Sequence, residues 1–331
     1  MLVGFDGFVD TLFHCVGQRT GTKAFQRLST LVSFSKRVRC ASCQSTNIEV
    51  VPLTQTIGGN APLLSQALLS LGIPSTLIGA CGYPVLHPLF RPLKARGMKI
   101  HSIASPGLTT ALEFTDGKLF LGNMGELNGL TANEALSRLP RGLISSLLSK
   151  AEVLATVNWT MMPLVEQFWD FLLENGRLLR KDQPCLFVDL SDPAKRPEAD
   201  LKRCLGRLHR LSRCCRVTLG LNRSESHPVC KVLGLPLSSL KRNAERIFTK
   251  LSLHSVIVHS RSEAVVASAE GIAAETILPI LRPVRLTGAG DTFNAGYIAS
   301  MLRHLPPDEC LREAIAVSRE FVKTGKQRRD R

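Results

Sequence analysis

The chain has 331 residues, enough for one large α/β domain or two smaller domains. A hydrophobic content of 44% and a charged content of 21% argue against a disordered chain. The net charge of +15 comes from basic residues scattered along the chain and a basic tail at 323–331, and aromatic residues make up only 5%. We read this charge as solvated surface and do not expect a nucleic-acid-binding protein.

The cysteines and the apolar stretches indicate the compartment. Asp6 and Asp10 interrupt the N-terminal apolar run, and no basic segment precedes it, so we expect no secretory signal. No apolar stretch reaches membrane-spanning length without a proline or a charge. Cys40 and Cys43 have the spacing of zinc ligands, but no second pair of ligands accompanies them. The ten cysteines therefore favour reduced thiols in a cytoplasmic protein.

The first part of the chain alternates strands and helices. Residues 2–5 read as a buried strand, residues 20–48 as an inserted helix with a polar connection, and residues 47–53 as a strand with one exposed face. A helix is expected after residue 60, a strand at 75–80 and a helix at 90–97. The dipeptide Asp116-Gly117 predicts a hairpin between strands at 109–114 and 118–122.

The rest of the chain continues the alternation. The expected elements are strands at 153–158, 185–190, 217–221 and 256–259, helices at 163–180, 200–211, 237–251, 291–303 and 307–323, and a second hairpin at 264–269 and 273–278. Such alternation predicts a mostly parallel sheet covered by helices on both faces. No internal repeat or linker divides the chain.

A glycine-rich turn opens the helix at 291–303. Gly288, Ala289 and Gly290 are small enough for backbone N–H groups to crowd one point, and a helix N-terminus favours an anion there. Asp291 follows directly, although a carboxylate repels a phosphate. Its presence is explained if it takes a proton from an alcohol that attacks the phosphate. The alternative is that Asp291 only caps the helix or interacts favourably with its dipole.

Other polar residues also follow predicted strands. They are Asp6 and Asp10, Gly58-Gly59-Asn60, Asn158-Trp159, Asp189 with Asp192, and the run 222–225. The carboxyl ends of parallel strands form the ligand-binding edge of an open sheet, so these groups are expected to converge. Asn60 is either a helix N-cap or a donor to a ligand hydroxyl, and Trp159 either stacks on a sugar or belongs to the core.

This set of residues resembles the ribokinase-like (PfkB) carbohydrate kinase family over nearly the full chain. The most specific match is TGAGDTFNAG at 287–296, which is similar to the C-terminal signature of the family. Weaker matches are Gly58-Gly59 with Leu71-Gly72, the NxxE pattern of Asn222 and Glu225, and Asp10 after the first strand. The resemblance implies a ribokinase-like α/β fold, with a mostly parallel central sheet, helices on both faces and a small β-lid.

The resemblance also implies roles for the reacting centre. Asp291 would deprotonate the acceptor hydroxyl, and the N–H groups of Gly288, Ala289 and Gly290 would form the anion hole for the transferring phosphoryl group. Residues assigned to the substrate are Asp10, Gly58, Gly59, Asn60 and, from its place at a strand end, Trp159.

For the nucleotide and metal, Asn222 and Glu225 would hold Mg²⁺ through water beside the ATP phosphates. An ordinary helix-start carboxylate is the alternative for Glu225. Thr287, His259 and Arg261 would contribute to nucleotide binding. The resemblance further implies one kinase domain over residues 1–331, with lid segments at about 11–56 and 105–125. Relatives often pair through their lids, so it allows a homodimer.

Four positions depart from the family pattern, and one of them is Tyr83-Pro84 after Gly82, where acidic residues are common. Leu63 stands where an asparagine is usual, so the substrate contacts near this turn differ. Arg285 replaces an aspartate that helps to hold a monovalent cation in relatives, and an arginine repels a cation or substitutes for it. We therefore expect no monovalent cation site. His259-Ser260-Arg261 replaces the usual Thr-x-Gly.

We expect an ATP- and Mg²⁺-dependent kinase that phosphorylates a hydroxyl of a sugar or sugar-like small molecule. One alternative is a nucleoside or vitamin-precursor kinase of the same fold, whose aromatic clamp would come from Phe114, Phe120 or Trp159. A catalytically silent sugar-binding protein is another, favoured by the changes at Leu63, Arg285 and His259. Asp291 and the intact glycine turn argue against it.

Overall fold

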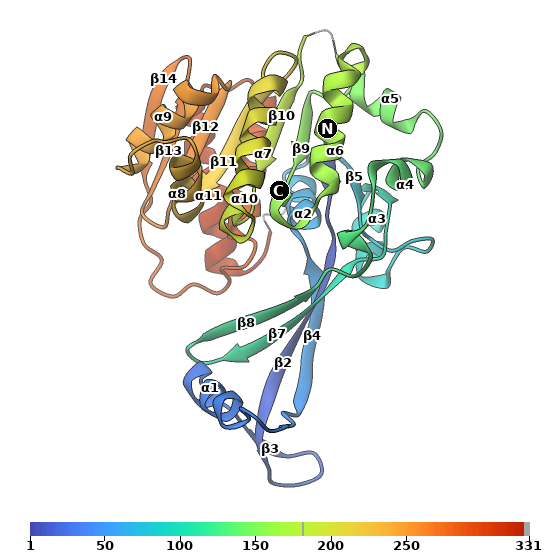
Figure 1. Ribbon diagram of the computed structural model, residues 1–331, viewed down its shortest axis with the longest axis vertical. Helices are drawn as coiled ribbons and strands as arrows, with labels where there is room; N and C mark the ends of the chain where they lie inside the picture. Colours follow the sequence, from blue (N-terminus) through green and yellow to red (C-terminus); the bar gives the residue numbers. More distant parts are fainter. Residues whose placement is uncertain (181, 328–331) are drawn as a thin grey trace.

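The computed structural model describes residues 1–180 and 182–327. These residues form a nine-stranded sheet flanked by helices and a separate five-stranded sheet that projects from it (Figure 1). The last four residues of the predicted basic tail, 328–331, lie outside the described residues. None of the helices in the described part of the chain is both long and apolar enough to cross a membrane.

The large sheet has the strand order β14-β13-β12-β11-β10-β9-β1-β5-β6. Its strands are β1 (Leu2–Phe5), β5 (Thr76–Gly79), β6 (Lys99–Ser102), β9 (Val153–Thr156), β10 (Cys185–Asp189), β11 (Arg216–Asn222), β12 (Ser255–His259), β13 (Glu263–Ser268) and β14 (Gly271–Thr276). All pairs from β12 to β6 are parallel, and β13 and β14 add an antiparallel edge. This arrangement confirms the predicted α/β class and the second hairpin.

Helices cover both faces of the large sheet. One face carries α4 (Ala132–Ser137), α5 (Leu143–Leu148), α6 (Leu164–Glu174), α7 (Glu198–Leu211), α8 (Arg223–Val232) and α9 (Leu240–Leu251), and the other carries α2 (Asn60–Ser70), α3 (Arg91–Ala95), α10 (Ala289–Leu302) and α11 (Pro307–Thr324). The β10 side chains alternate between the two cores, with Leu186 and Val188 in the first and Cys185 and Phe187 in the second.

The smaller sheet is built from β2 (Phe8–Arg19), β3 (Phe25–Arg27), β4 (Val50–Gly58), β7 (Gly107–Phe114) and β8 (Gly117–Asn123). Helix α1 (Leu31–Cys40) lies at its far end (Figure 1). Two residues, Asp6 and Gly7, separate β1 from β2, and a single residue, Gly59, separates β4 from α2. The two sheets therefore meet at Asp6-Gly7 and at Gly59.

Two predicted elements are shorter than expected. The helix expected within 20–48 spans only Leu31–Cys40, because the preceding segment pairs with β2 as strand β3. The helix expected at 163–180 ends at Glu174, where Asn175 leaves helical geometry and Gly176 follows. The hairpin across Asp116-Gly117 is confirmed by the pairing of β7 with β8.

Candidate active site

The junction between the sheets is tightly packed around glycines. A Cβ on Gly7 would lie 2.1 Å from the carbonyl oxygen of Ala80, and Gly59 has a φ of +89°, which favours glycine. A Cβ on Gly58 would meet the carboxylate oxygens of Asp10 at 2.3 and 2.4 Å. The glycine pair thus lets a carboxylate lie directly against the start of α2.

Asp6 organises this junction. Its fully buried carboxylate accepts hydrogen bonds from the N–H of Asn60 at 2.9 Å, the N–H of Ala61 at 2.7 Å and Nδ2 of Asn158 at 2.7 Å. These bonds fix the first turn of α2. The Asn158 Oδ1 atom is buried and has no hydrogen-bond partner in the described part of the chain.

Asn60 connects the start of α2 to the start of α10. Its Nδ2 donates to Oδ1 of Asp291 at 2.9 Å. The helix cap is Gly59 rather than Asn60, so the N-cap interpretation of Asn60 is wrong. The backbone N–H of Asn60 donates to Asp6, and this bond holds the residue in the position from which its side chain contacts Asp291.

Asp291 lies in the first turn of α10, and only 8% of it is exposed. Gly288 is the N-cap, with a φ of +88°, and no described side chain caps the helix, so the capping interpretation of Asp291 is also wrong. Its place in the first turn still allows a favourable interaction with the helix dipole. The Ala289 N–H donates to the Leu286 carbonyl at 3.0 Å. The N–H groups of Gly288 and Gly290 have no acceptor among the described residues, so both are available to a ligand at this helix start.

A second carboxylate pair lies next to this turn. Asp189 accepts hydrogen bonds from Nδ2 of Asn294 at 2.7 Å and from the N–H of Ser191 at 2.9 Å. Glu225 accepts from the N–H of Asn222 at 2.8 Å and from that of Asp192 at 2.9 Å. Asn222 Oδ1 in turn accepts from the Glu225 N–H, which completes a capping box at the start of α8.

Burial and mutual repulsion raise the pKa values of these acids. Burial, followed by the negative charge of Asp189, raises the pKa of Asp291 well above its ordinary value. The same two causes raise the pKa of Glu225 to about 7. Burial raises the pKa of Asp6 to about 6 and also raises that of Asp189. Because these four acids repel one another at one edge of the sheet, binding of a cation or of a group that donates a proton is favourable there.

Asp10 faces the same region from strand β2. Burial raises its pKa, while a hydrogen bond with Thr109 and the positive charge of Arg285 act in the opposite direction. Arg285 donates from Nε to the Thr287 carbonyl at 3.2 Å, and its guanidinium carbon lies 5.4 Å from the centre of the Phe321 ring. This guanidinium therefore stands beside the loop that leads into Gly288.

The three residues predicted for the nucleotide lie further along the edge. His259 ends strand β12, and burial lowers its pKa to about 4, so the imidazole is neutral near pH 7. Its ring centre lies 4.8 Å from that of Phe293. Arg261 is exposed in the following turn, and Thr287 is exposed before α10. Leu63, by contrast, is buried behind Gly288.

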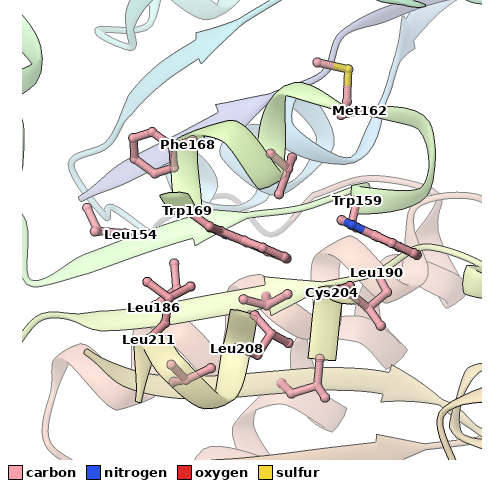
Figure 2. Close-up of a cluster of buried hydrophobic side chains, with 14 of the residues drawn as sticks. Leu154, Trp159, Met162, Phe168, Trp169, Leu186, Leu190, Cys204, Leu208 and Leu211 are labelled. Carbon is pink, nitrogen blue, oxygen red and sulfur yellow. The ribbon is translucent and has the colours of Figure 1, made fainter. Parts of the chain in front are cut away.

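Trp159 does not form a sugar platform, which corrects the prediction. Its side chain is completely buried among the hydrophobic residues that include Leu190 and Met162 (Figure 2). The indole Nε1 donates to Glu166 at 2.8 Å, and the Arg196 guanidinium carbon lies 4.1 Å from the ring centre. No face of the ring is left for a ligand.

The structure thus brings Asp10, Gly58, Gly59, Asn60 and the 288–291 turn to one junction, while Trp159 belongs to the core. The sequence did not predict that Asp6 organises the junction. Its position after the first strand is apparent, but its partners Asn60 and Asn158 are remote in sequence. Nor did the sequence predict the bond between Asn294 and Asp189, which no local pattern indicates.

Comparisons with known proteins agree with this arrangement. Residues 1–329 match the sequence model of the prokaryotic ketohexokinase family. A ketohexokinase from Haloferax volcanii is 28% identical over 328 residues, covering 98% of this chain and 87% of that protein.

Solved structures share the fold. A carbohydrate kinase from Agrobacterium tumefaciens superposes with a TM-score of 0.66 at 19% identity, covering 98% of this chain and 91% of the other. Phosphofructokinase-2 from Escherichia coli, in complex with substrates and products, gives 0.66 at 12% identity, covering 97% and 92%. Adenosine kinase from Sinorhizobium meliloti gives 0.65 at 15% identity, covering 99% and 95%. The chain therefore belongs to the prokaryotic ketohexokinase family of PfkB sugar kinases, and it is a carbohydrate kinase with a ribokinase-like fold.

Proposed function

We propose that this kinase transfers the γ-phosphoryl group of ATP to a primary hydroxyl of a ketohexose. The family match and the Haloferax volcanii relative support the choice of sugar. The observation that carries the proposed chemistry is the hydrogen bond between Asn60 and Asp291, because it joins a turn suited to sugar hydroxyls to a buried carboxylate at a helix start.

Asp291 is the proposed general base. Its raised pKa makes the carboxylate a better proton acceptor than an exposed aspartate, provided that it is ionised when the sugar binds. The sugar hydroxyl gives its proton to Asp291 while its oxygen forms a bond to the γ-phosphorus. The bond from that phosphorus to the bridging oxygen breaks, and ADP leaves with the electron pair.

The anion hole is assigned first to the N–H groups of Gly288 and Gly290. Both are without an acceptor among the described residues and lie at the positive end of α10. The Ala289 N–H joins them only if it releases the Leu286 carbonyl. These donors would stabilise the charge on the transferring phosphoryl oxygens, and their fixed positions require no reorganisation during the reaction.

Asn222 and Glu225, together with Asp189, are the proposed holders of Mg²⁺ through its waters. Their oxygen donors suit a hard cation, and the raised pKa values of both acids reflect a negative site without a counter-charge. When bound, Mg²⁺ neutralises charge on the ATP phosphates. The backbone bonds to Glu225 keep this carboxylate in place.

Sugar hydroxyls are assigned to Asp10 and Asn60, with Gly58 and Gly59 allowing close approach to the backbone. Asp6 positions Asn60 and does not itself face the sugar, because it is fully buried. Arg261 and Thr287 are the proposed nucleotide contacts. His259, which is neutral, would contribute ring contact rather than charge.

Arg285 is proposed to replace the monovalent cation that relatives place beside this loop. Its guanidinium already donates to the Thr287 carbonyl and covers the Phe321 ring. A fixed positive charge at this position leaves no need for potassium.

We also propose that residues 1–331 act as one kinase domain whose projecting sheet, with segments at about 11–56 and 105–125, serves as a lid. Its root at Asp10 and Gly58 adjoins the junction, which supports closure over a sugar. Exposed apolar side chains at Leu53, Leu108 and Phe120 support pairing of two lids in a homodimer. The ten free cysteines support a cytoplasmic location.

A substrate panel tests this function. ADP release would be measured with ATP, Mg²⁺ and each of fructose, glucose, ribose, sugar acids and adenosine. The proposal expects kcat/KM for fructose to exceed that for every other compound by at least about tenfold. Preference for adenosine would instead support the nucleoside kinase alternative, and no turnover with any compound would favour a silent binding protein.

A further inference from the structure

A basic cavity lies behind the glycine turn, where Leu63 and Phe321 pack against Gly288. It has a volume of about 500 Å³ and lies between α2, the end of α3, the loop before α10 and the end of α11. This volume falls within the range of small-molecule sites, which is roughly 300–1,000 Å³.

The cavity gathers positive charge on its lining. Arg96, Arg285 and Lys326 all line it, and no aspartate or glutamate among the described residues does. Within residues 1–180 and 182–327, none of the three forms an ion pair with a carboxylate. Three cations that converge on one hollow repel one another, and an anion bound among them removes this repulsion.

The other residues that line the cavity indicate what the uncharged part of the ligand is like. Gln66 and Gln327 provide amide groups, while Leu63, Leu69 and Phe321 form an apolar wall. An inorganic ion would fill little of this space and leave the apolar wall unused. A compact anion attached to a body of about hexose size fits the charge, the amides and the volume together.

The cavity shares walls with the catalytic turn. A Cβ on Gly288 would lie 3.5 Å from Phe321 and 3.7 Å from Leu63. Gln327 donates from Nε2 to Oγ1 of Thr292 at 3.1 Å, and Thr292 adjoins Asp291. An occupant of the cavity would therefore touch the outer wall of the turn that carries the proposed base.

We propose that this cavity is a second ligand site, distinct from the reaction centre, which binds a phosphorylated small molecule of about hexose size. The proposal goes beyond the proposed function, since its ligand is neither the reacting sugar nor the nucleotide. It identifies Arg96 as a residue of the ligand site outside the proposed catalytic machinery.

Isothermal titration calorimetry with glucose 6-phosphate tests the site. The full-length kinase is first saturated with Mg²⁺ and a non-hydrolysable ATP analogue, which occupies the phosphoryl position at the anion hole. Ionic strength is held constant, and glucose and inorganic phosphate are titrated in parallel. We expect one saturable site for glucose 6-phosphate, at least about tenfold weaker binding of inorganic phosphate, and no binding of glucose at this site.

Charge-matched variants locate the binding. Arg96→Gln is expected to weaken glucose 6-phosphate binding by about tenfold, because it removes a charge-assisted donor. Lys94→Gln removes one charge from an exposed position on the same short helix, outside the cavity lining, and is expected to change binding less than about twofold. Gln66→Leu provides a second variant of the lining and is expected to weaken binding about threefold or more.

Three results would overturn the proposal: no saturable binding to the unmodified kinase, unchanged binding in both Arg96→Gln and Gln66→Leu, or equal weakening in Lys94→Gln and Arg96→Gln. Melting temperatures of all variants verify that each is folded. Because binding is measured without turnover, the result is independent of the substrate panel. A kinase that phosphorylates fructose but does not bind glucose 6-phosphate here would retain its proposed function and lose this site.

Discussion

Asn60 donates a hydrogen bond to Asp291 at 2.9 Å, although the two residues are 231 positions apart in the chain. The bond stabilises the ionised carboxylate and so opposes the raised pKa that burial and Asp189 impose on Asp291. Removing it should raise that pKa further. We therefore expect Asn60→Ala to move the acid limb of the kcat/KM profile to higher pH, in addition to raising KM for the sugar.

The pH profile separates this effect from a simple loss of sugar contact. Loss of contact alone would lower kcat/KM equally at every pH. Gln66→Ala, on the same helix but without a bond to Asp291, serves as the control and should leave the acid limb in place. An unshifted limb in Asn60→Ala would show that the bond does not tune Asp291.

Asp291 should also reduce the stability of the free protein. Its folded-state pKa lies above the unfolded value of about 3.8, so the folded state binds more protons between these two pKa values. Stability is therefore lost as pH rises through this window, and the loss is complete above the folded pKa. Asp291→Asn removes this buried ionisable group and is expected to raise the melting temperature at pH 7.5 by roughly 2–4 °C without ligands.

The same variant near pH 3.5 provides the internal control. There the native carboxyl is protonated, so the difference in melting temperature should shrink toward zero. A variant that is less stable than the unmodified chain at pH 7.5 would mean that the carboxylate is satisfied in the fold and not destabilised by burial.

Sequence patterns predicted the parts of this site that depend on local chemistry. The glycine turn and the helix that follows it, the glycine pair before α2, and the strand–helix alternation all follow from residue spacing. Convergence at one sheet edge follows from the parallel strand order. These features depend on neighbours in sequence or on a general property of α/β sheets.

The sequence patterns gave wrong predictions where tertiary contacts determine the role of a side chain. Asn60 matched a helix N-cap, but Gly59 takes that place and the Asn60 side chain bonds Asp291. Trp159 stands at a strand end, where a ligand contact is plausible, but Glu166 and Arg196 enclose its ring. Neither set of contacts produces a periodic pattern in the sequence, because each joins side chains from different helices or loops.

Potassium should not stimulate this kinase. Arg285 places a permanent positive charge beside the Thr287 carbonyl, where relatives are expected to use a cation. Initial rates in potassium, sodium and choline chloride at equal ionic strength should agree within about twofold. A many-fold stimulation by potassium alone would contradict the substitution of a guanidinium for the cation.

Trp159 should matter for stability and not for sugar binding. Trp159→Phe removes the indole bond to Glu166 and part of a fully buried ring, so a loss of about 1–3 kcal/mol in unfolding free energy is expected. The KM for the sugar should change less than about twofold.

Trp169→Phe is the matched control for that experiment. Trp169 is also completely buried and donates from its indole to Thr156 at 3.0 Å. Similar losses of stability in both variants, with unchanged KM, fit a core role. A large rise in KM confined to Trp159→Phe would restore the stacking hypothesis.

The central claim is that Asp291 takes the proton of the sugar hydroxyl during transfer. The most direct test is the turnover of Asp291→Asn with fructose, ATP and Mg²⁺, alongside sugar binding measured by calorimetry. The account predicts that kcat falls by about 10² or more while the dissociation constant for the sugar stays within a few-fold, because the amide keeps the shape but accepts no proton. Turnover close to that of the unmodified kinase would contradict it.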